Sequence, residues 1–546
     1  MPLLVRTPRV PHAPARRRAL AAAAAVLGLA LTAPGAADAA TLHVAPAGCD
    51  DTRTAAVATS PSTPLCSIPR AWALAAPGDV VAVHDGSYPA ASLTGGTSRT
   101  APVTIAAAPG ALPRIAGLRL AGTSKVVLDH LDLSGLLDVD LGTSSVTVRA
   151  SNLRNGMALE EGVRDVLVES SWITSPTSMG IHWSTDASRP AIEDVTIRRT
   201  RFQDVGVVAI NARNFRNVVI EDNEFVGTHS WDGIRHTDVI RTYAGGRGLF
   251  VRRNFIHDNA AQGFFIKDGK VSDAVLEDNV IVRTDKHYAV NVYNVDGIRV
   301  ANNTIADNYG SVAFNGTATN AEFVNNISHS LLVPGTVSWL REDYNVLPGR
   351  GGTGPNEIRA TPLFVDPAAR DYRLAATSPG VGTGLAAELS PIDIQRVART
   401  GVAGLLDGRP VTGLGAYGTA GTSGAPPWPA PGVVVPQEPV GPAPAFDGLT
   451  LDAPSLTWSS SSVYVRARCS LACIVRATNV TPGVTQTART ATLAAGAEGT
   501  LRIPVDRREL RAIAGGASTV TLTIAVAAST ADGKRASRTL SLPVAL

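Results

Sequence analysis

Short runs of alternating apolar and polar residues recur through the middle of the chain. An eight-residue pattern, apolar at its first, third and eighth positions, returns about every 24 residues. Such alternation predicts β-strands with one buried face. Strand, turn and second strand at this interval are typical of a parallel β-solenoid, whose coils stack about 4.8 Å apart. The copies begin at Val126, Val146, Val166, Val195, Val218, Leu249, Ala274, Ile298 and Ala321.

The sixth position of the pattern carries asparagine in five consecutive copies. Side-chain amides stacked from one coil to the next can hydrogen-bond along the axis, as in an asparagine ladder. Scattered turn asparagines are the alternative, but a fixed register favours the ladder. The predicted rungs are structural and comprise Asn223, Asn254, Asn279, Asn303 and Asn326.

The repeats and the segments around them resemble the right-handed parallel β-helix of the pectate-lyase-like superfamily. The stretch TPLCSIPRAWALAAPGDVVAVHDGSY resembles the N-terminal cap and first coil of secreted bacterial members, which implies a capping helix over Ile68 to Ala75. The stretches PLFVDPAARDYRLAATSPG and LDGRPVTGLGAYG resemble the exit from the helix. The resemblance therefore implies an all-β chain with a β-helix over residues 40–418. It implies no single reaction, because this scaffold carries lyases, hydrolases, epimerases and non-enzymes.

The two ends of the chain predict export and a second domain. Three arginines at 16–18 precede an apolar run and a small-residue cleavage site, so residues 1–39 are predicted to be a signal peptide rather than a retained membrane anchor. The sequence therefore predicts a secreted or cell-wall-associated protein with no transmembrane segment in the mature chain. Eight prolines at 419–447 predict a stiff linker. Alternating runs over 448–546 predict a small immunoglobulin-like β-sandwich.

The four cysteines all follow the predicted signal peptide. An even number in an exported chain indicates disulfides, with three possible pairings. Proximity in the sequence favours Cys49–Cys66 and Cys469–Cys473, one bridge in each predicted domain.

Charge argues against a nucleic-acid partner. The net charge is +3, but residues 1–39 hold five arginines and one aspartate, so the chain without them carries −1. A nearly neutral chain lacks the basic surface that nucleic acids require. The partner expected instead is a polysaccharide or cell-wall glycan, bound by a monomer.

The second strand of each predicted coil suggests a functional surface. These strands align as GMALE, GIHWS, VAINA, GIRHT, GFFIK, AVNVY and SVAFN, the fourth starting at Gly233. An inward second residue would leave a mixture of cations, aromatic rings and amides facing outward on one sheet. The predicted outward residues are Glu160, His182, Asn211, Arg235, Thr237, Phe265, Lys267, Asn291, Tyr293 and Asn315.

These residue types fit β-elimination from a uronic-acid polysaccharide. The reaction needs a base for the proton at carbon 5, a cation for the neighbouring carboxylate, and an acid for the leaving oxygen. Lys267 is the candidate base, because lysine is scarce in the chain and can titrate where arginine cannot. Arg235 is the candidate carboxylate ligand, and His229, His236 or Tyr293 the candidate acid.

Further roles are assigned to residues along the same surface. Glu160, His182, Asn211, Phe265 and Asn291 are candidate substrate ligands. Calcium could replace the cationic side chain, as in the lyases that the chain resembles, and its candidate ligands are Asp232, Asp238 and Asp268.

Three alternatives remain open from the sequence. Asp238 and Asp268 could form the carboxylate pair of a retaining glycoside hydrolase. Arg235 near Asp268 could be a plain salt bridge. The protein could also be a non-catalytic surface or glycan-binding β-helix. The chain lacks the Gly-His-Gly signature of polygalacturonases and the WxDH stretch of well-known pectate lyases, so no catalytic residue is transferred from them.

Overall fold

The computed structural model describes residues 39–385 without interruption, then 394, 405–406, 409–410, 415–417 and most of 451–545. The predicted signal peptide up to residue 38 and the predicted linker at 419–447 lie outside the described residues.

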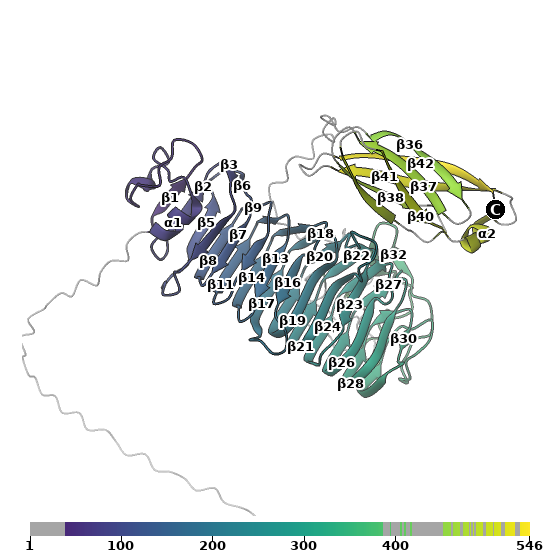
Figure 1. The fold of residues 1–546 in the computed structure, drawn as a ribbon. Coiled ribbons are helices and arrows are strands. Elements are labelled where there is room, and N and C mark those ends of the chain that lie inside the picture. Colours follow the sequence, from purple (N-terminus) through teal and green to yellow (C-terminus); the bar gives the residue numbers. More distant parts are fainter. Residues whose placement is uncertain are drawn as a thin grey trace, which may run out of the picture. The chain divides into compact units, whose positions relative to one another are not determined.

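Residues 41–343 wind into a parallel β-helix whose coils each contribute strands to three sheets (Figure 1). The chain passes from sheet 1 to sheet 2 to sheet 3 and then enters the next coil. Sheet 1 contains β1 (Thr41–Val44), β2 (Val80–Val83), β5 (Val103–Ala107), β8 (Ser124–Asp129), β11 (Ser144–Arg149), β14 (Arg164–Glu169), β17 (Ile192–Arg198), β24 (Val271–Glu277) and β31 (Thr336–Asp343).

Sheets 2 and 3 follow the same stacking. Sheet 2 contains β3 (Gly86–Tyr88), β6 (Pro113–Ile115), β9 (Asp132–Leu133), β12 (Asn152–Leu153), β15 (Trp172–Ser175), β18 (Arg201–Val205), β20 (Glu224–Val226), β22 (Phe255–Asn259), β25 (Val280–Thr284), β27 (Thr304–Ala306) and β29 (Ile327–Ser328). Sheet 3 contains β4 (Ala91–Thr94), β7 (Leu118–Ala121), β10 (Leu137–Val139), β13 (Met157–Glu160), β16 (Ile181–Ser184), β23 (Gln262–Ile266) and β30 (Leu331–Leu332).

Four long strands join sheet 3 to sheet 1, which is why the pairings connect both into one continuous sheet. Each belongs to sheet 3 at its start and to sheet 1 at its end. They are β19 (Val208–Glu221), β21 (Asp238–Arg252), β26 (Val290–Ala301) and β28 (Val312–Val324).

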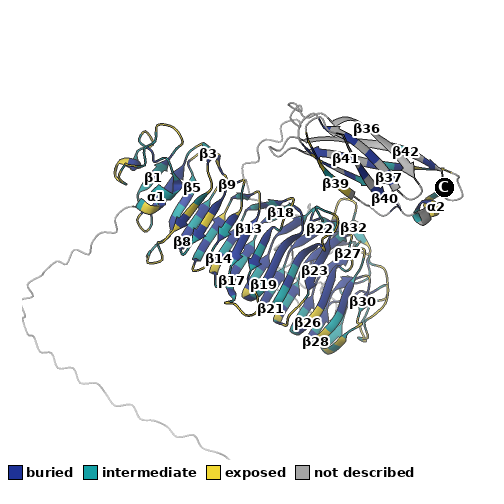
Figure 2. Cartoon of the chain, viewed as in Figure 1, coloured by how far each residue is buried: buried dark blue, intermediate teal, exposed yellow. Residues whose placement is uncertain are grey.

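Alternate residues of these strands fill one continuous hydrophobic interior, as the sequence pattern predicts. Buried and partly exposed residues follow one another along the strands in Figure 2. Trp183 is 1% exposed inside the coils, and Phe202 and Phe225 stack with ring centroids 4.7 Å apart. The parallel β-helix predicted from the repeat is confirmed.

The predicted asparagine ladder is confirmed and is longer than the sequence indicated. In each asparagine rung the side-chain oxygen accepts the backbone N–H of the preceding rung, at 3.0–3.1 Å between Asn223 and Asn326. Hydroxyl oxygens of Ser151, Ser171 and Thr200 do the same on earlier coils, and Asn345 ends the ladder. Each of these hydroxyl groups also donates to a backbone carbonyl two residues earlier, so a hydroxyl can replace the amide as both acceptor and donor.

The N-terminal end is closed as the resemblance implies. Helix α1 (Ile68–Leu74) buries Ile68, Ala71 and Trp72 against the first coils, and Ser67 caps it by accepting the Arg70 N–H at 3.3 Å. A short 3₁₀ helix, η1 (Val57–Thr59), lies in the preceding loop.

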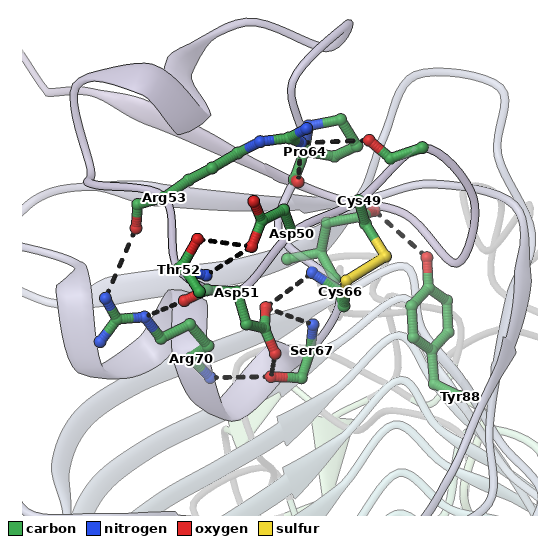
Figure 3. Close-up of a disulfide and its surroundings, with 12 residues drawn as sticks. Cys49, Asp50, Asp51, Thr52, Arg53, Pro64, Cys66, Ser67, Arg70 and Tyr88 are labelled. Carbon is green, nitrogen blue, oxygen red and sulfur yellow. Dashed lines mark hydrogen bonds between the residues drawn. A yellow bond between two sulfur atoms is a disulfide. The ribbon is translucent and has the colours of Figure 1, made fainter.

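A disulfide and a carboxylate hold that loop to the helix (Figure 3). The predicted Cys49–Cys66 bridge is present. Asp51 accepts hydrogen bonds from the Cys66 and Ser67 backbone N–H groups and from the Ser67 hydroxyl, at 2.7–3.2 Å. The bridge and the capping residue are therefore tied to one side chain.

The C-terminal part of the chain forms two antiparallel sheets around one hydrophobic core, which confirms the predicted β-sandwich. It contains the predicted Cys469–Cys473 disulfide. Its elements are β36 (Leu451–Ser459), β37 (Ser462–Cys469) and β40 (Glu498–Pro504) in one sheet, β39 (Ala488–Leu493), β38 (Cys473–Asn479), β41 (Thr519–Ser529) and β42 (Arg535–Ala545) in the other, and α2 (Arg507–Ala514).

Two short hairpins follow the last coil. Tyr372 packs with Phe255 and Val282 on the outside of sheet 2, and its hydroxyl donates to Asp307 at 2.7 Å. The hairpins pair β32 (Phe364–Asp366) with β33 (Asp371–Leu374), and β34 (Leu405–Leu406) with β35 (Arg409–Pro410).

The ladder ends on an acidic group. Glu357 accepts the Asn345 side-chain N–H at 2.8 Å. Burial, a hydrogen bond with Glu342 and the charges of Glu342 and Asp343 raise the pKa of Glu357 to about 8. The carboxyl group therefore stays protonated in the folded protein at pH values where it ionises in the unfolded chain.

We expect this carboxyl group to make the last coil less stable as the pH rises from about 5 to 8. In that window the folded state holds one proton more than the unfolded state, so unfolding releases it and stability falls with pH. Glu357→Gln should remove this pH dependence. Its gain in unfolding free energy over the wild type should be about 2 kcal/mol larger at pH 8 than at pH 5, a value reduced for partial solvent exposure. Urea unfolding of both proteins at the two pH values measures the difference, and parallel pH dependences would contradict it.

Candidate functional site

The outer surface of sheet 3 carries two columns of side chains, one residue per coil. Strand pairing aligns His182 with Asn211, Asn211 with Arg241, and Arg241 with Phe265. The first column is Asp138, Ala158, His182, Asn211, Arg241, Phe265, Asn291 and Ala313. Two residues further along each coil the second column is Asp140, Glu160, Ser184, Arg213, Tyr243, Lys267, Tyr293 and Asn315.

Most of the predicted outward residues occupy these columns. The residues between the two columns point inward, as Trp183, Ala212 and Ile266 show by their burial. Lys267, which directly follows β23, and Asn291 of β26 lie on the same face as Arg241. The sequence predicted an arginine on this face next to Lys267, and Arg241 is the arginine that lies there. We call this face the strip.

The predicted place of Arg235 on the strip is wrong. Asp238, not Gly233, begins the strand of this coil, and Arg241 occupies the position assigned to Arg235. The segment before it turns instead, because Gly233 has a φ of +72° and Asp232 accepts the backbone N–H groups of Ile234 and Arg235. Thr237 likewise precedes the strand and is buried, with its hydroxyl donating to the Ala260 carbonyl.

Arg235 and Asp232 pair with each other in the loop before β21. Arg235 Nε donates to Asp232 Oδ2 at 2.9 Å, and its guanidinium lies 5.5 Å from the centre of the Trp231 ring. Hydrogen bonds from the Ile234 N–H, and then from Arg235 and the Ser230 hydroxyl, lower the pKa of Asp232 well below its usual range. The predicted alternative of a plain salt bridge holds for Arg235, but with Asp232 in place of Asp268.

His229 lies at the base of the same loop, largely buried. Its Nδ1 is 2.9 Å from the Gly227 carbonyl and 3.5 Å from Asp204. These contacts hold His229 at the start of the loop, away from the side-chain contacts of the strip.

Cations and aromatic rings alternate at the centre of the strip. The Arg213 guanidinium and the Lys267 amine lie 5.0 and 5.7 Å from the centre of the Tyr243 ring. The Phe265 and Tyr293 rings are 5.6 Å apart. Three coils thus present Arg213, Arg241 and Lys267 in sequence on one face.

Arg241 is held from two sides. Its Nε donates to Asn211 Oδ1 at 3.1 Å and its Nη1 to Asp238 Oδ2 at 3.2 Å, and the side chain is 13% exposed. Asp238 is completely buried and also contacts His236 Nδ1 at 3.1 Å. The guanidinium is therefore fixed in the sheet with N–H groups left for a ligand.

Amide side chains continue the strip toward the C-terminal coils. Asn315 donates to Asn291 at 2.7 Å, and Asn291 donates to Gln262 at 3.4 Å. Gln262 is the strand partner of Asp238, so this chain of amides reaches the coil that carries Arg241.

The N-terminal end of the strip is acidic. Burial and then the Asp140 charge raise the pKa of Asp138. Burial is also the largest cause of the raised pKa of Glu160, to which Asp138 and Asp140 add. His182, on the next coil, has a pKa lowered by burial, and its Nδ1 has no hydrogen-bond partner among the described residues.

The three predicted calcium ligands do not converge. Asp232 is bound to its own loop, Asp238 to Arg241 and His236, and Asp268 is 61% exposed beside Lys267. Asp268 lies next to Gly245, seven residues beyond Asp238 along β21, or roughly 20 Å of extended chain. Across the described ranges, no three His, Cys, Asp or Glu side chains form a group that could hold a metal ion. These residues do not fit the predicted calcium site.

Comparisons with known proteins agree with the fold. A family model described as a right handed beta helix region matches residues 180–329. No curated protein matches the chain. The helices among the described residues include none with the length and apolar character needed to cross a membrane.

Several solved structures are similar to this chain at low identity. Pectate lyase Pel9A is 15% identical, with a TM-score of 0.41 over 70% of this chain and 97% of its own. XylC, in complex with xylose, is 9% identical, with a TM-score of 0.41 over 69% of this chain and 98% of its own. PfbA, a surface adhesin of Streptococcus pneumoniae, is 11% identical, with a TM-score of 0.32 over 50% of this chain and 75% of its own.

Similarities of this size concern the fold alone and assign no role to any side chain. The matched segment 180–329 contains the part of the strip from His182 to Asn315. The architecture that presents the strip is a right-handed parallel β-helix.

Proposed function

We propose that the strip binds a polysaccharide rich in uronic-acid carboxylates and cleaves it by β-elimination, outside the cell or at the cell wall. The observation that carries this proposal is the alternation of Arg213, Arg241 and Lys267 with Tyr243, Phe265 and Tyr293 on successive coils. Cations pair with carboxylates, and aromatic faces accept the apolar faces of sugar rings.

The repeat of the solenoid suits a polymer. Coils follow one another about 4.8 Å apart, so equivalent side chains form rows along the axis. A chain lying across three coils would meet a cation on each of them.

Arg241 is the group best placed to neutralise the carboxylate next to carbon 5. It is fixed by Asn211 and Asp238, whereas Arg235 is engaged by its own loop. The carboxylate makes the adjacent proton acidic only when a cation stabilises the enolate that forms.

Lys267 fits a binding role better than the role of base. An amine acts as a base after losing its proton, which burial or nearby cations promote. Lys267 is 38% exposed and its amine lies 4.0 Å from the Asp268 carboxylate. We therefore give Lys267 a place among the cations that hold substrate carboxylates.

Glycoside hydrolysis is the second candidate, on different residues from those the sequence indicated. Asp238 and Asp268 are too far apart to form a pair. Asp138 and Glu160 lie on successive coils, and both have raised pKa values. A protonated acid within about 5 Å of a carboxylate is the arrangement of a retaining glycosidase.

The test is a screen of the purified full chain on pectate, alginate and glycosaminoglycans. β-Elimination gives an unsaturated sugar, seen by its ultraviolet absorbance, whereas hydrolysis gives reducing ends without it. Arg241→Ala should slow formation of the unsaturated product by about 10²–10³-fold, and Glu160→Gln should leave it intact. Product that is saturated and depends on Glu160 would favour hydrolysis, and retained binding without any product would favour a non-catalytic glycan-binding protein.

A further inference from the structure

A histidine and a buried aspartate stand beside Arg241 at the start of β21. His236 Nδ1 lies 3.1 Å from Asp238 Oδ2, and the same oxygen accepts Arg241 Nη1 at 3.2 Å. The two donors are therefore within about 6 Å of each other. Asp238 is 0% exposed, whereas His236 is 41% exposed, so the pair reaches from the interior to the surface.

The surroundings fix the orientation of the His236 ring. The His287 ring stacks on it with an angle of 11° and a centroid distance of 5.1 Å, and the Phe265 ring lies 5.8 Å away. The groups that face His236 are thus Asp238 and Arg241 on its own coil, Phe265 on the next coil, and His287 before β26.

The geometry determines which nitrogen is available for chemistry. A carboxylate accepts hydrogen bonds, so the neutral His236 ring carries its proton on Nδ1 and leaves Nε2 as a lone-pair acceptor. A carboxylate at Nδ1 also stabilises the imidazolium that forms when Nε2 takes up a proton. A histidine held in this way can accept a proton from a substrate at Nε2 and return it.

We propose that His236 is the catalytic base and acid of the strip and that Asp238 is its positioning residue, with Arg241 binding the substrate carboxylate next to them. This assignment rests on the proposed β-elimination. It replaces Lys267 as base and differs from the His229 and Tyr293 assignments for the acid. It follows from the Oδ2 atom of Asp238, which contacts both side chains. Arg241, which would make the carbon-5 proton acidic, therefore lies beside His236, which would remove it.

The proton balance closes with His236 alone. Neutral Nε2 takes the proton from carbon 5, and the electrons of that C–H bond form the double bond between carbons 4 and 5. The bond from carbon 4 to the glycosidic oxygen breaks. The imidazolium then gives its proton to the leaving oxygen, and His236 returns to its neutral form.

A second observation indicates that the site is built to meet a ligand. Asp238 Oδ1 and the Nε2 atom of Gln262, its strand partner, are both buried without a hydrogen-bond partner among the described residues. Buried polar atoms are normally satisfied, and the exceptions call for a functional reason. An acceptor and a donor thus lie at paired strand positions on the coil of Arg241 and on the next coil.

The first test needs no substrate. Nitrogen NMR of the full chain should show the neutral His236 ring protonated at Nδ1, and Asp238→Asn should change the tautomer or broaden it into a mixture. His130 is the matched control, because it pairs with Asp129 at 2.7 Å on another part of the surface. A wild-type His236 ring protonated at Nε2 would overturn the assignment.

The second test measures elimination on whichever polymer the wild-type protein cleaves. His236→Ala should lower kcat by about 10²–10⁴-fold, and added imidazole should restore part of the rate. Asp238→Asn should lower kcat by at least about 10-fold and should shift the acidic limb of the pH–rate profile. His130→Gln should match the wild type.

The outcomes separate this inference from the proposed function. A wild-type protein that releases unsaturated product while His236→Ala keeps its rate would overturn the inference and leave the lyase function standing. If Lys267→Ala alone abolished the rate, the base would be Lys267. A wild-type protein that forms no unsaturated product on any polymer would overturn both. Melting temperatures of the variants near that of the wild type show that a lost rate reflects chemistry.

Discussion

Replacing Arg241 by alanine is expected to lower kcat/KM for the proposed elimination by about 10²–10³-fold, the usual effect of removing a fixed donor to developing negative charge. The guanidinium has five N–H groups and uses two of them for Asn211 and Asp238. The remaining three can hold a carboxylate in one orientation. Initial rates on the polymer found in the screen measure the effect.

Arg241→Ala also leaves the buried Asp238 carboxylate without its cation, so its loss of rate can include a structural effect. A second variant that keeps the positive charge is therefore needed. Arg241→Lys keeps the charge but cannot reach both neighbours with a planar fork, and we expect it to lose most of the rate as well. Arg247→Ala is the matched control, because Arg247 lies on the same strand, is 76% exposed and pairs with Asp273 on sheet 1. An Arg241→Lys protein with the wild-type rate would show that charge alone suffices.

Replacing Asn279 by alanine is expected to destabilise the β-helix by about 3–5 kcal/mol. The side chain donates to the Val251 carbonyl at 2.8 Å and to Asn303 at 3.0 Å, and its oxygen accepts two N–H groups of Asn254 at 3.0 Å. Each buried group left without a partner costs roughly 1–3 kcal/mol. The free energy of unfolding from urea titration measures the loss.

Two further variants show whether the ladder is the cause. Asn279→Thr keeps an acceptor, as Thr200 does on an earlier coil, and should lose less stability than Asn279→Ala. Asn152→Ala should change stability by no more than about 0.5 kcal/mol, because Asn152 is half-buried on the outside of sheet 2. Equal losses for Asn279→Ala and Asn152→Ala would contradict the structural role of the ladder.

Much of the strip could be predicted because strand alternation has a period of two residues. Once one residue of a strand is known to point inward, its neighbours must point outward, and this rule places His182, Phe265, Lys267 and Asn291 correctly. The rule fails where an insertion shifts the start of a strand. The run GIRHT resembles a strand, but the alternation in VIRTY immediately after it is the one that pairs with β19.

The His236–Asp238–Arg241 group had no separate signal in the sequence. Histidine, aspartate and arginine are common on protein surfaces, and here they lie within six positions of the chain. Only the contact of His236 and Arg241 with one oxygen of Asp238 distinguishes them. The hydroxyl rungs of the ladder were missed for a similar reason, since Ser151, Ser171 and Thr200 are ordinary turn residues until the coils above and below them are in place.

The sequence by itself determined what depends on local periodicity: the parallel coils, the inward residues and the asparagine ladder. The resemblance of the entry stretch implied the capping helix, and proximity in the sequence favoured the two disulfides that form. These features repeat or lie close together in the chain, so neighbouring residues are enough to reveal them. The tertiary structure decided which arginine faces the strip, which carboxylates lie together and which histidine meets a buried aspartate. Those contacts join residues on different coils or follow a loop of irregular length, and the register that brings them together is set by pairing with adjacent strands.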